Sequence, residues 1–428
     1  MKKVLIIANL CHTSPRVRGL AKYLPEFGWE PIVVTPHCSQ VAGSQLRIIE
    51  TPYRDALGPW KKLLGIRPGE NDIRKQVKAR FGVNSKKSLL DYALTAGGAI
   101  FNYPDGEKGW KPFAISEGSK IIQSEDISAI ISNSAPVTSH IIAKELKAKY
   151  GIPWVADFRD PWSQNHNYSY GPIRQLIDRR LERKTLSKAD SLVIVSKLWA
   201  NKLEDLHRGK VVYTITNSFD PDEVNNPPAE LTAKFTITYS GSVWPQKQHP
   251  WKFLAAIRDL VSDRTIDPND IKIRFYGPKE SWLEREIEQY GLSSIVKQLG
   301  IIPRQVVLEK QRESHILLLI AWEDSQKQGA YGGKTFEYLA ARRPILVTGY
   351  PSNVIKELLN ETGAGIWASN TEIIKNSLIE MYQEYKGKSA VTYKGKESII
   401  DKYSHREGAN KLSQILDSLY LKWQAHHR

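Results

Sequence analysis

The stretch Gly329–Gly349 reads GAYGGKTFEYLAARRPILVTG, and its order of loop, helix and strand decides the fold class. It follows an apolar run, His315–Trp322, of the kind that forms a strand buried in a parallel sheet. Gly332 and Gly333 allow a ligand to approach the backbone closely, and a helix is predicted to begin there. Exposed amides and the positive end of the helix dipole favour an anion at this point, most simply a phosphate.

Two charged side chains in the first turns of this helix suit a nucleotide. Lys334 lies beside the expected phosphate. Glu337, one turn later, is spaced to bind a sugar hydroxyl, as an acidic residue binds ribose in dinucleotide sites. A P-loop would need glycine at position 328, which is occupied by Gln328, so that motif is excluded. A plain helix start with two solvated charges stays open as the simpler alternative.

Strands and helices alternate through most of the 428 residues, which is too long a chain for one ordinary core. We therefore expect an α/β protein with two parallel-sheet domains. The predicted strands are Val4–Leu10, Pro31–Thr35, Ala129–Ser134, Trp154–Arg159, Ser191–Ser196 and Val211–Thr216, then Phe235–Ser240, Ile271–Gly277, Val296–Ile301, His315–Trp322, Pro344–Thr348 and Gly365–Ala368.

Three segments resemble one known family. KTFEYLAARRPILVTG (334–349) resembles the nucleotide-binding segment of the family-4 retaining glycosyltransferases, which have the GT-B fold. SPRVRGLAKYLPEFGWEPIVVT (14–35) and SAPVTSHIIAKELKAKYGIPWVADFRDPW (134–162) resemble the same family. The resemblance implies two Rossmann-like, doubly wound domains, residues 1–218 and 219–402, that face a central cleft. It also implies a carboxy-terminal helix, 403–428, that packs back toward the first domain, and transfer of a sugar from a nucleotide sugar with retention. It also implies that Lys334 binds the donor diphosphate and Glu337 binds the ribose.

The chain departs from the family pattern at two positions. The family has a glutamate eight residues before Glu337, where this sequence has Gly329. The segment GSVWPQK (241–247) resembles a diphosphate-binding loop in which Gly241 and Lys247 match, whereas Ser242 replaces an arginine. These departures leave open a protein that binds a nucleotide sugar without transferring it, and a GT-B epimerase is a further alternative.

The strand ends and the resemblance together give the candidate site. Ligands bind beyond the carboxyl ends of parallel strands, so Arg159 and Asp160 are expected to face the crevice. Arg159 occupies the position where many family members carry a histidine. The expected catalytic residues are Arg159, Asp160, Lys247 and Lys334; the donor-binding residues are Gly241, Ser242, Lys247, Gly329, Ala330, Tyr331, Gly332, Gly333, Lys334, Thr335 and Glu337; and the acceptor-side residues are Arg16, Asp157 and Asn217. For Arg16, a plain surface charge is an equally open alternative.

We expect neither a metal nor a cofactor besides the donor substrate. Asp220-Pro221-Asp222 has a DxD spacing, but its place in a linker predicts a turn. Cys11 and Cys38 are the only cysteines and form no Cys/His cluster, so we expect reduced structural thiols. With no apolar run near the roughly 20 residues that span a bilayer, and no signal peptide, the expected location is cytoplasmic.

The net charge of +15 requires an anionic partner. No nucleic-acid-binding signature is present, so nucleic acid is not expected. An irregular insertion at about 54–102 contains Trp60–Leu90, which has nine cationic residues and only two acidic ones. This segment is predicted to lie on an anionic membrane or to hold a lipid-linked acceptor, with a solvated helical face as the alternative. Together with the resemblance, which implies bacterial cell-surface polysaccharide or glycolipid synthesis, the expectation is a cytoplasmic protein that can bind peripherally to the inner face of the membrane.

Overall fold

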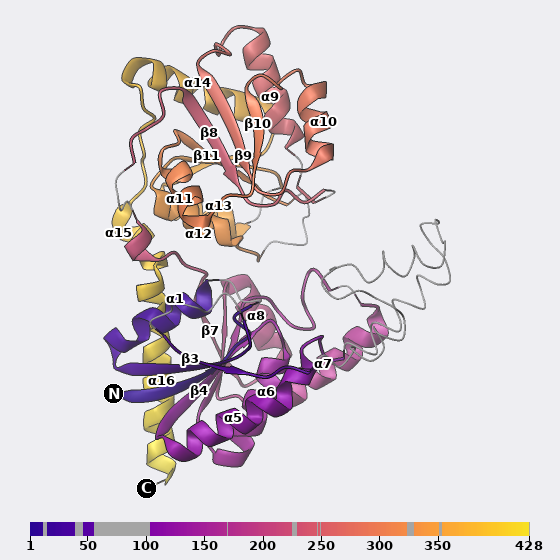
Figure 1. The fold of residues 1–428 in the computed structure, drawn as a ribbon, viewed down its shortest axis with the longest axis vertical. Helices are drawn as coiled ribbons and strands as arrows, with labels where there is room; N and C mark the ends of the chain where they lie inside the picture. Colours follow the sequence, from indigo (N-terminus) through magenta and orange to yellow (C-terminus); the bar gives the residue numbers. More distant parts are fainter. Residues whose placement is uncertain are drawn as a thin grey trace. The chain divides into compact units, whose positions relative to one another are not determined.

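The protein forms two compact units (Figure 1). The computed structural model describes residues 1–11, 15–38, 46–54, 103–168, 170–224, 229–245, 247–248, 250–322, 329–350 and 353–427. The first unit comprises Met1–Val195, Trp199–Ile215 and Ala409–Arg428, and the second comprises Ser196–Leu198 and Thr216–Gly408. The basic segment Trp60–Leu90 lies outside the described residues.

The first unit is built on a parallel sheet in the order β3-β2-β1-β4-β5-β6-β7. The strands are β1 (Lys2–Ile7), β2 (Trp29–Pro36), β3 (Arg47–Thr51), β4 (Ile127–Ser134), β5 (Trp154–Phe158), β6 (Ser191–Ile194) and β7 (Val211–Thr214). The helices are α1 (Arg16–Tyr23), α5 (Lys111–Ser124), α6 (Thr138–Tyr150), α7 (Pro172–Leu186), α8 (Lys197–Leu206) and α16 (His405–His427). The strand order reverses at β1, as in doubly wound folds. Leu412 and Leu416 of α16 pack into the core beside Val4 and Val33.

The second unit has a parallel sheet in the order β10-β9-β8-β11-β12-β13. The strands are β8 (Phe235–Ser240), β9 (Ile271–Tyr276), β10 (Val296–Gly300), β11 (Ile316–Ile320), β12 (Ile345–Thr348) and β13 (Gly365–Ala368). The helices are α9 (Trp251–Ser262), α10 (Ser281–Gln289), α11 (Arg304–Arg312), α12 (Gly333–Ala341), α13 (Asn353–Thr362), α14 (Thr371–Lys388) and α15 (Glu397–Ile400).

The position of β11 between two hydrophobic cores explains why its sequence is apolar throughout. Ile316, Leu318 and Ile320 belong to one hydrophobic core, whereas Leu317 and Leu319 belong to a second core on the other side. Alternate side chains of a strand point to opposite faces of the sheet, so a strand covered by helices on both faces has no polar position. The predicted α/β fold with two parallel, doubly wound sheets is confirmed.

Several local predictions need correction. Strand β3 was not predicted, and neither was α5, which begins at Lys111. The turn at Asp220 is confirmed, because its Oδ1 accepts a hydrogen bond from the backbone N–H of Asp222 at 3.0 Å. Among the described helices, none combines the length and the apolar character needed to cross a membrane.

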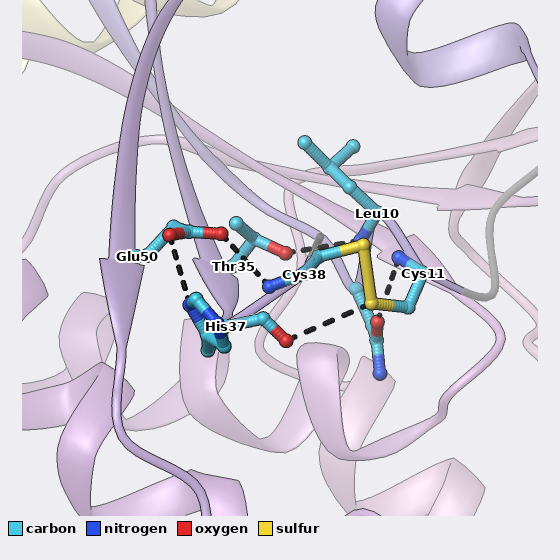
Figure 2. Close-up of a disulfide and its surroundings, with 7 residues drawn as sticks. Leu10, Cys11, Thr35, His37, Cys38 and Glu50 are labelled. Atoms are coloured by element: carbon cyan, nitrogen blue, oxygen red, sulfur yellow. Dashed lines mark hydrogen bonds and ion pairs between the residues drawn. A yellow bond between two sulfur atoms is a disulfide. The ribbon is translucent and has the colours of Figure 1, made fainter. Parts of the chain in front are cut away.

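The expectation of reduced cysteines is wrong, because Cys11 and Cys38 form a disulfide (Figure 2). Their Cα atoms lie 5.7 Å apart, although 27 residues separate them in sequence. Cys11 follows β1 and Cys38 follows β2, and these are neighbouring parallel strands. One strand-helix-strand step therefore brings the two side chains to the same edge of the sheet, a proximity that spacing alone did not reveal.

Candidate functional site

The predicted helix start is present, and Lys334 is tied to the neighbouring strand. Helix α12 begins at Gly333 with Gly332 as its N-cap. Lys334 Nζ donates a hydrogen bond to Tyr239 Oη at 2.5 Å and lies 3.9 Å from the centroid of that ring. Tyr239 Oη in turn donates to the backbone oxygen of Ser242 at 2.8 Å. The first turn of α12 is thereby linked to the end of β8 and to the loop that follows it.

That loop packs so closely that glycine is required at two positions. Gly241 has φ +108°, and a Cβ atom there would lie 3.0 Å from Lys334 Nζ. Gly277, which follows β9, has φ +146°, and a Cβ atom would lie 2.4 Å from the carbonyl oxygen of Gly241. Both φ values favour glycine, and the second contact leaves no room for any side chain. The backbones after β8 and β9 therefore form one wall around Lys334.

A hollow of about 410 Å³ opens beside this wall. It is lined by Ser240, Gly241, Ser242, Tyr276, Gly277, Pro278, Ile301, Ile302, Arg304, Val307, Lys334 and Glu337. Its glycines follow the carboxyl ends of β8 and β9, where open α/β sheets bind ligands. Of the expected donor-binding residues, the structure brings Gly241, Ser242, Lys334 and Glu337 together in this hollow.

Glu337 is held by an arginine that the sequence had not singled out. Arg304 Nη1 lies 2.6 Å from Glu337 Oε1, and its Nη2 lies 2.7 Å from Glu223 Oε2. Burial acts to lower the pKa of Arg304, but attraction to the two carboxylates outweighs it and raises that pKa. Burial raises the pKa of Glu223. Arg304 is the first residue of α11, just after β10, so its position beyond the end of a parallel strand is the signal that could have identified it.

Burial also sets the charge of Lys334. It lowers the pKa of the ammonium group to about 7, and the carboxylate of Glu337 opposes that shift only in part. Because one hydroxyl and one ring face stabilise the ammonium less than water does, the charged form is held at a cost. An anion in the hollow would favour the charged form again, so the site is suited to an anionic ligand.

The remaining donor-side candidates are not among the residues that line the hollow. Lys247 is exposed and is not among the residues lining the hollow; its Nζ lies 4.8 Å from the centroid of the Trp322 ring. Gly329 is buried, whereas Ala330 is half-buried. Tyr331 packs edge-on against Phe336, with ring centroids 5.5 Å apart. The buried Thr335 hydroxyl has no hydrogen-bond partner among the described residues.

The acceptor-side candidates pair with one another in the first unit. Arg16 and Asp157 form a buried two-bond ion pair, with Nε–Oδ2 at 3.0 Å and Nη2–Oδ1 at 2.8 Å. Asn133 Nδ2 also donates to Asp157 Oδ2, at 2.7 Å. Because Arg16 is only 3% exposed, the surface-charge alternative is wrong. Its guanidinium holds the ends of α1 and β5 together.

Arg159 and Asp160 are also paired, with Nε 3.1 Å from Oδ2, and both are half-buried just beyond β5. Asn217 falls in the second unit, where its Oδ1 is buried without a partner among the described residues. The four expected catalytic residues are thus divided between the units, Arg159 and Asp160 in the first and Lys247 and Lys334 in the second. Within the described parts of the chain, no three His, Cys, Asp or Glu side chains gather as a metal site would require.

Comparison with known proteins agrees with the fold. The family model of Glycosyltransferase Family 4 matches residues 15–223, just under half of the chain. No curated protein matches the sequence. Among solved structures, a glycosyltransferase from Rickettsia africae has a TM-score of 0.61 at 14% identity, with 98% of each chain covered.

Two further structures extend the comparison. HepE from Anabaena, solved with UDP and glucose, has a TM-score of 0.62 at 11% identity, covering 98% of this chain and 100% of its own. A putative UDP-N-acetylglucosamine 2-epimerase from Listeria monocytogenes has a TM-score of 0.56 at 13% identity, covering 99% and 98%. The architecture is therefore GT-B, and together the comparisons support a glycosyltransferase.

The buried ammonium predicts a pH dependence of stability. With a folded pKa of about 7 against 10.5 for a free lysine, the unfolded chain binds more protons at Lys334 between these values. The contribution of Lys334 to the free energy of unfolding therefore rises with pH in that window, by up to about 1.4 kcal/mol per unit, and is lowest below pH 7. Urea denaturation of Lys334→Met should lack this slope relative to wild type.

The exposed Lys272 provides the matched control, since Lys272→Met should keep the wild-type slope. Equal pH dependence in wild type and Lys334→Met would show that the ammonium is not buried at a cost.

Proposed function

We propose that the protein is a retaining glycosyltransferase that moves a sugar from a nucleotide-sugar donor to an acceptor hydroxyl. The observation that carries this proposal is the half-buried Lys334 at the start of α12, whose ammonium lies against Tyr239 beside a hollow that also contains Glu337. A diphosphate suits the cation and the helix amides, while a ribose hydroxyl suits the carboxylate. The UDP and UDP-glucose complexes of HepE, a neighbour in fold, support a uridine nucleotide as the first donor to test.

The reaction would be driven by charge stabilisation at the leaving group. Negative charge grows on the nucleoside diphosphate as the bond to the sugar breaks. Lys334 and the amides of α12 would stabilise it there, without first having to rearrange. Glu337, held by Arg304, would fix the nucleoside. Retention of configuration is proposed from the resemblance to the family.

The acceptor is proposed to bind through the first unit, near Arg16, Asp157, Arg159 and Asp160, and Asn217 of the second unit is a separate acceptor-side candidate. We propose a glycan or lipid-linked acceptor, in the synthesis of bacterial surface polysaccharide or glycolipid, at the inner face of the membrane. The net charge of +15 supports an anionic surface as partner.

An epimerase is the second candidate, supported by the similar fold of the Listeria protein. Incubation with UDP-sugars separates the candidates. A transferase releases UDP and needs an acceptor for full turnover, whereas an epimerase yields a new UDP-sugar without one. A protein that only binds the donor would give neither product.

The proposal predicts different kinetic roles for Lys334 and Glu337. Lys334→Ala should lower kcat by on the order of 10²–10³, because it removes charge stabilisation that grows in the transition state. Glu337→Gln should mainly raise KM, because its bond to the donor is made equally in both states. The matched controls are Lys356→Ala and Glu357→Gln on α13, both exposed. Wild-type kinetics in both site variants would remove the proposed donor site.

Arg304 is predicted to act through Glu337, as a positioning residue. Arg304→Gln should raise the donor KM by about tenfold with kcat little changed, because a charge-assisted bond that orients Glu337 is lost. Arg304→Lys keeps the charge but not both contacts, so its donor KM should lie between those of wild type and Arg304→Gln. A fall in kcat equal to the change in kcat/KM would instead place Arg304 at the reacting atoms.

Turnover is predicted to survive chelation of divalent ions. In the proposed site a lysine and helix amides face the diphosphate, so no metal is required to neutralise it. UDP release should therefore be equal with and without EDTA. Loss of turnover in EDTA, restored by manganese, would contradict this.

A further inference from the structure

Helix α7 buries charged side chains and exposes aliphatic ones, which is the reverse of an ordinary surface helix. Its buried residues include Arg174, Asp178 and Glu182, whereas its exposed residues include aliphatic ones. Ile173 is 78% exposed, Leu176 is 53% exposed and Ile177 is 43% exposed. A helix on a globular protein normally buries its apolar stripe and exposes its charges. The exposed aliphatic cluster on α7 therefore needs an explanation.

The orientation of α7 is fixed by its buried polar side. Arg174 Nε lies 3.0 Å from Asp178 Oδ1, and Tyr168 Oη donates to Asp178 Oδ2 at 2.5 Å. The Arg174 guanidinium also lies over two tyrosine rings, 4.6 Å from the centroid of Tyr103 and 4.7 Å from that of Tyr170. Rotating the helix to bury its aliphatic residues would break these contacts. The apolar face is thus held outward.

A second anchor holds the middle of the helix. Glu182 is fully buried, and its Oε2 accepts a hydrogen bond from the backbone N–H of Ser163 at 3.0 Å. His207 Nε2 lies 3.4 Å from Glu182 Oε1. Both acidic residues of α7 are therefore inside the unit, and neither contributes a charge to its outer surface.

Every exposed charge from Gly171 to Lys188 is positive: Arg179, Arg180, Arg183, Lys184 and Lys188. At about 100° per residue, Ile173, Leu176, Ile177, Arg180 and Lys184 fall within an arc of roughly 100°. The outer surface of α7 is therefore one stripe, aliphatic in its first half and basic in its second.

We propose that this stripe docks on the surface of an anionic lipid bilayer. The aliphatic side chains would enter the boundary between headgroups and acyl chains, and the long basic side chains would reach the lipid phosphates. A second copy fits less well, because a symmetric contact would set one cationic stripe against another. Nucleic acid offers phosphates but no apolar layer for Ile173, Leu176 and Ile177.

This inference rests on the proposed location at a membrane, but not on the identity of the donor. It places the contact on the described helix α7 and thus differs from the expectation for Trp60–Leu90. UDP binding by the same variants distinguishes the two proposals, because a variant that loses vesicles but keeps UDP affects only the docking surface.

Co-sedimentation with vesicles tests the proposal. Wild type should bind vesicles of phosphatidylcholine with phosphatidylglycerol, and bind phosphatidylcholine alone more weakly. Arg180→Gln with Lys184→Gln should weaken binding by about 25-fold, since each basic residue near an anionic surface contributes about fivefold. Leu176→Gln with Ile177→Gln should weaken binding on the order of tenfold or more, because apolar burial is lost.

The matched control is Lys202→Gln with Arg208→Gln, which removes two exposed cations elsewhere in the same unit and should bind like wild type. Binding of wild type should also fall as salt shortens the screening length. No wild-type binding to either vesicle, or wild-type binding by both α7 variants, would overturn the proposal. If wild type were a dimer in solution and the variant Leu176→Gln with Ile177→Gln a monomer, the stripe would instead be the contact with a second copy.

Discussion

The contact between the Lys334 ammonium and the backbone after β8 constrains the whole second unit. The ammonium has room only because position 241 lacks a side chain, and that loop has room only because position 277 lacks one. Tyr239 supplies the hydroxyl and ring that face the cation, and the hydroxyl of Tyr338, on α12, accepts from the N–H of Ser240. Strand β8, the loop after β9 and helix α12 must therefore be assembled together before the lysine is held.

The parts of this site that sequence predicted are those that local pattern encodes. An all-apolar β11 and a glycine pair before a helix are local features, so the place of Lys334 followed from them. Arg304 was missed because its partners lie 33 and 81 residues away, and only the folded unit brings Glu337 of α12 and Glu223 of the turn Pro221–Glu223 to it. The disulfide was missed for the same reason, since its closeness comes from the pairing of β1 with β2.

The ion pair of Arg16 and Asp157 shows a second limit of reasoning from strand ends. Each residue was expected to face a ligand because of its position in the chain. In the folded unit the two side chains neutralise each other's charge, although they lie 141 positions apart in sequence. Asn133 donates a further hydrogen bond to the carboxylate of Asp157. Burying either charge alone would be costly, so the pair is held as a unit. A charged residue near a strand end is therefore weaker evidence for a ligand site when folding gives it an opposite charge.

The same criterion distinguishes Lys334 and α7 from the rest of the protein. Lys334 has a hydroxyl, a ring face and only the partial influence of Glu337, so its charge is incompletely compensated. On α7 the buried Arg174 and Asp178 neutralise each other, whereas the aliphatic residues are exposed to water. Folding alone explains neither arrangement, since each would be more stable with a partner of opposite or apolar character. The first partner is anionic and small enough for a hollow of about 410 Å³, whereas the second must be anionic, apolar and extended. The two partners that we propose, a nucleotide-sugar donor and the surface of an anionic bilayer, have these two sets of properties.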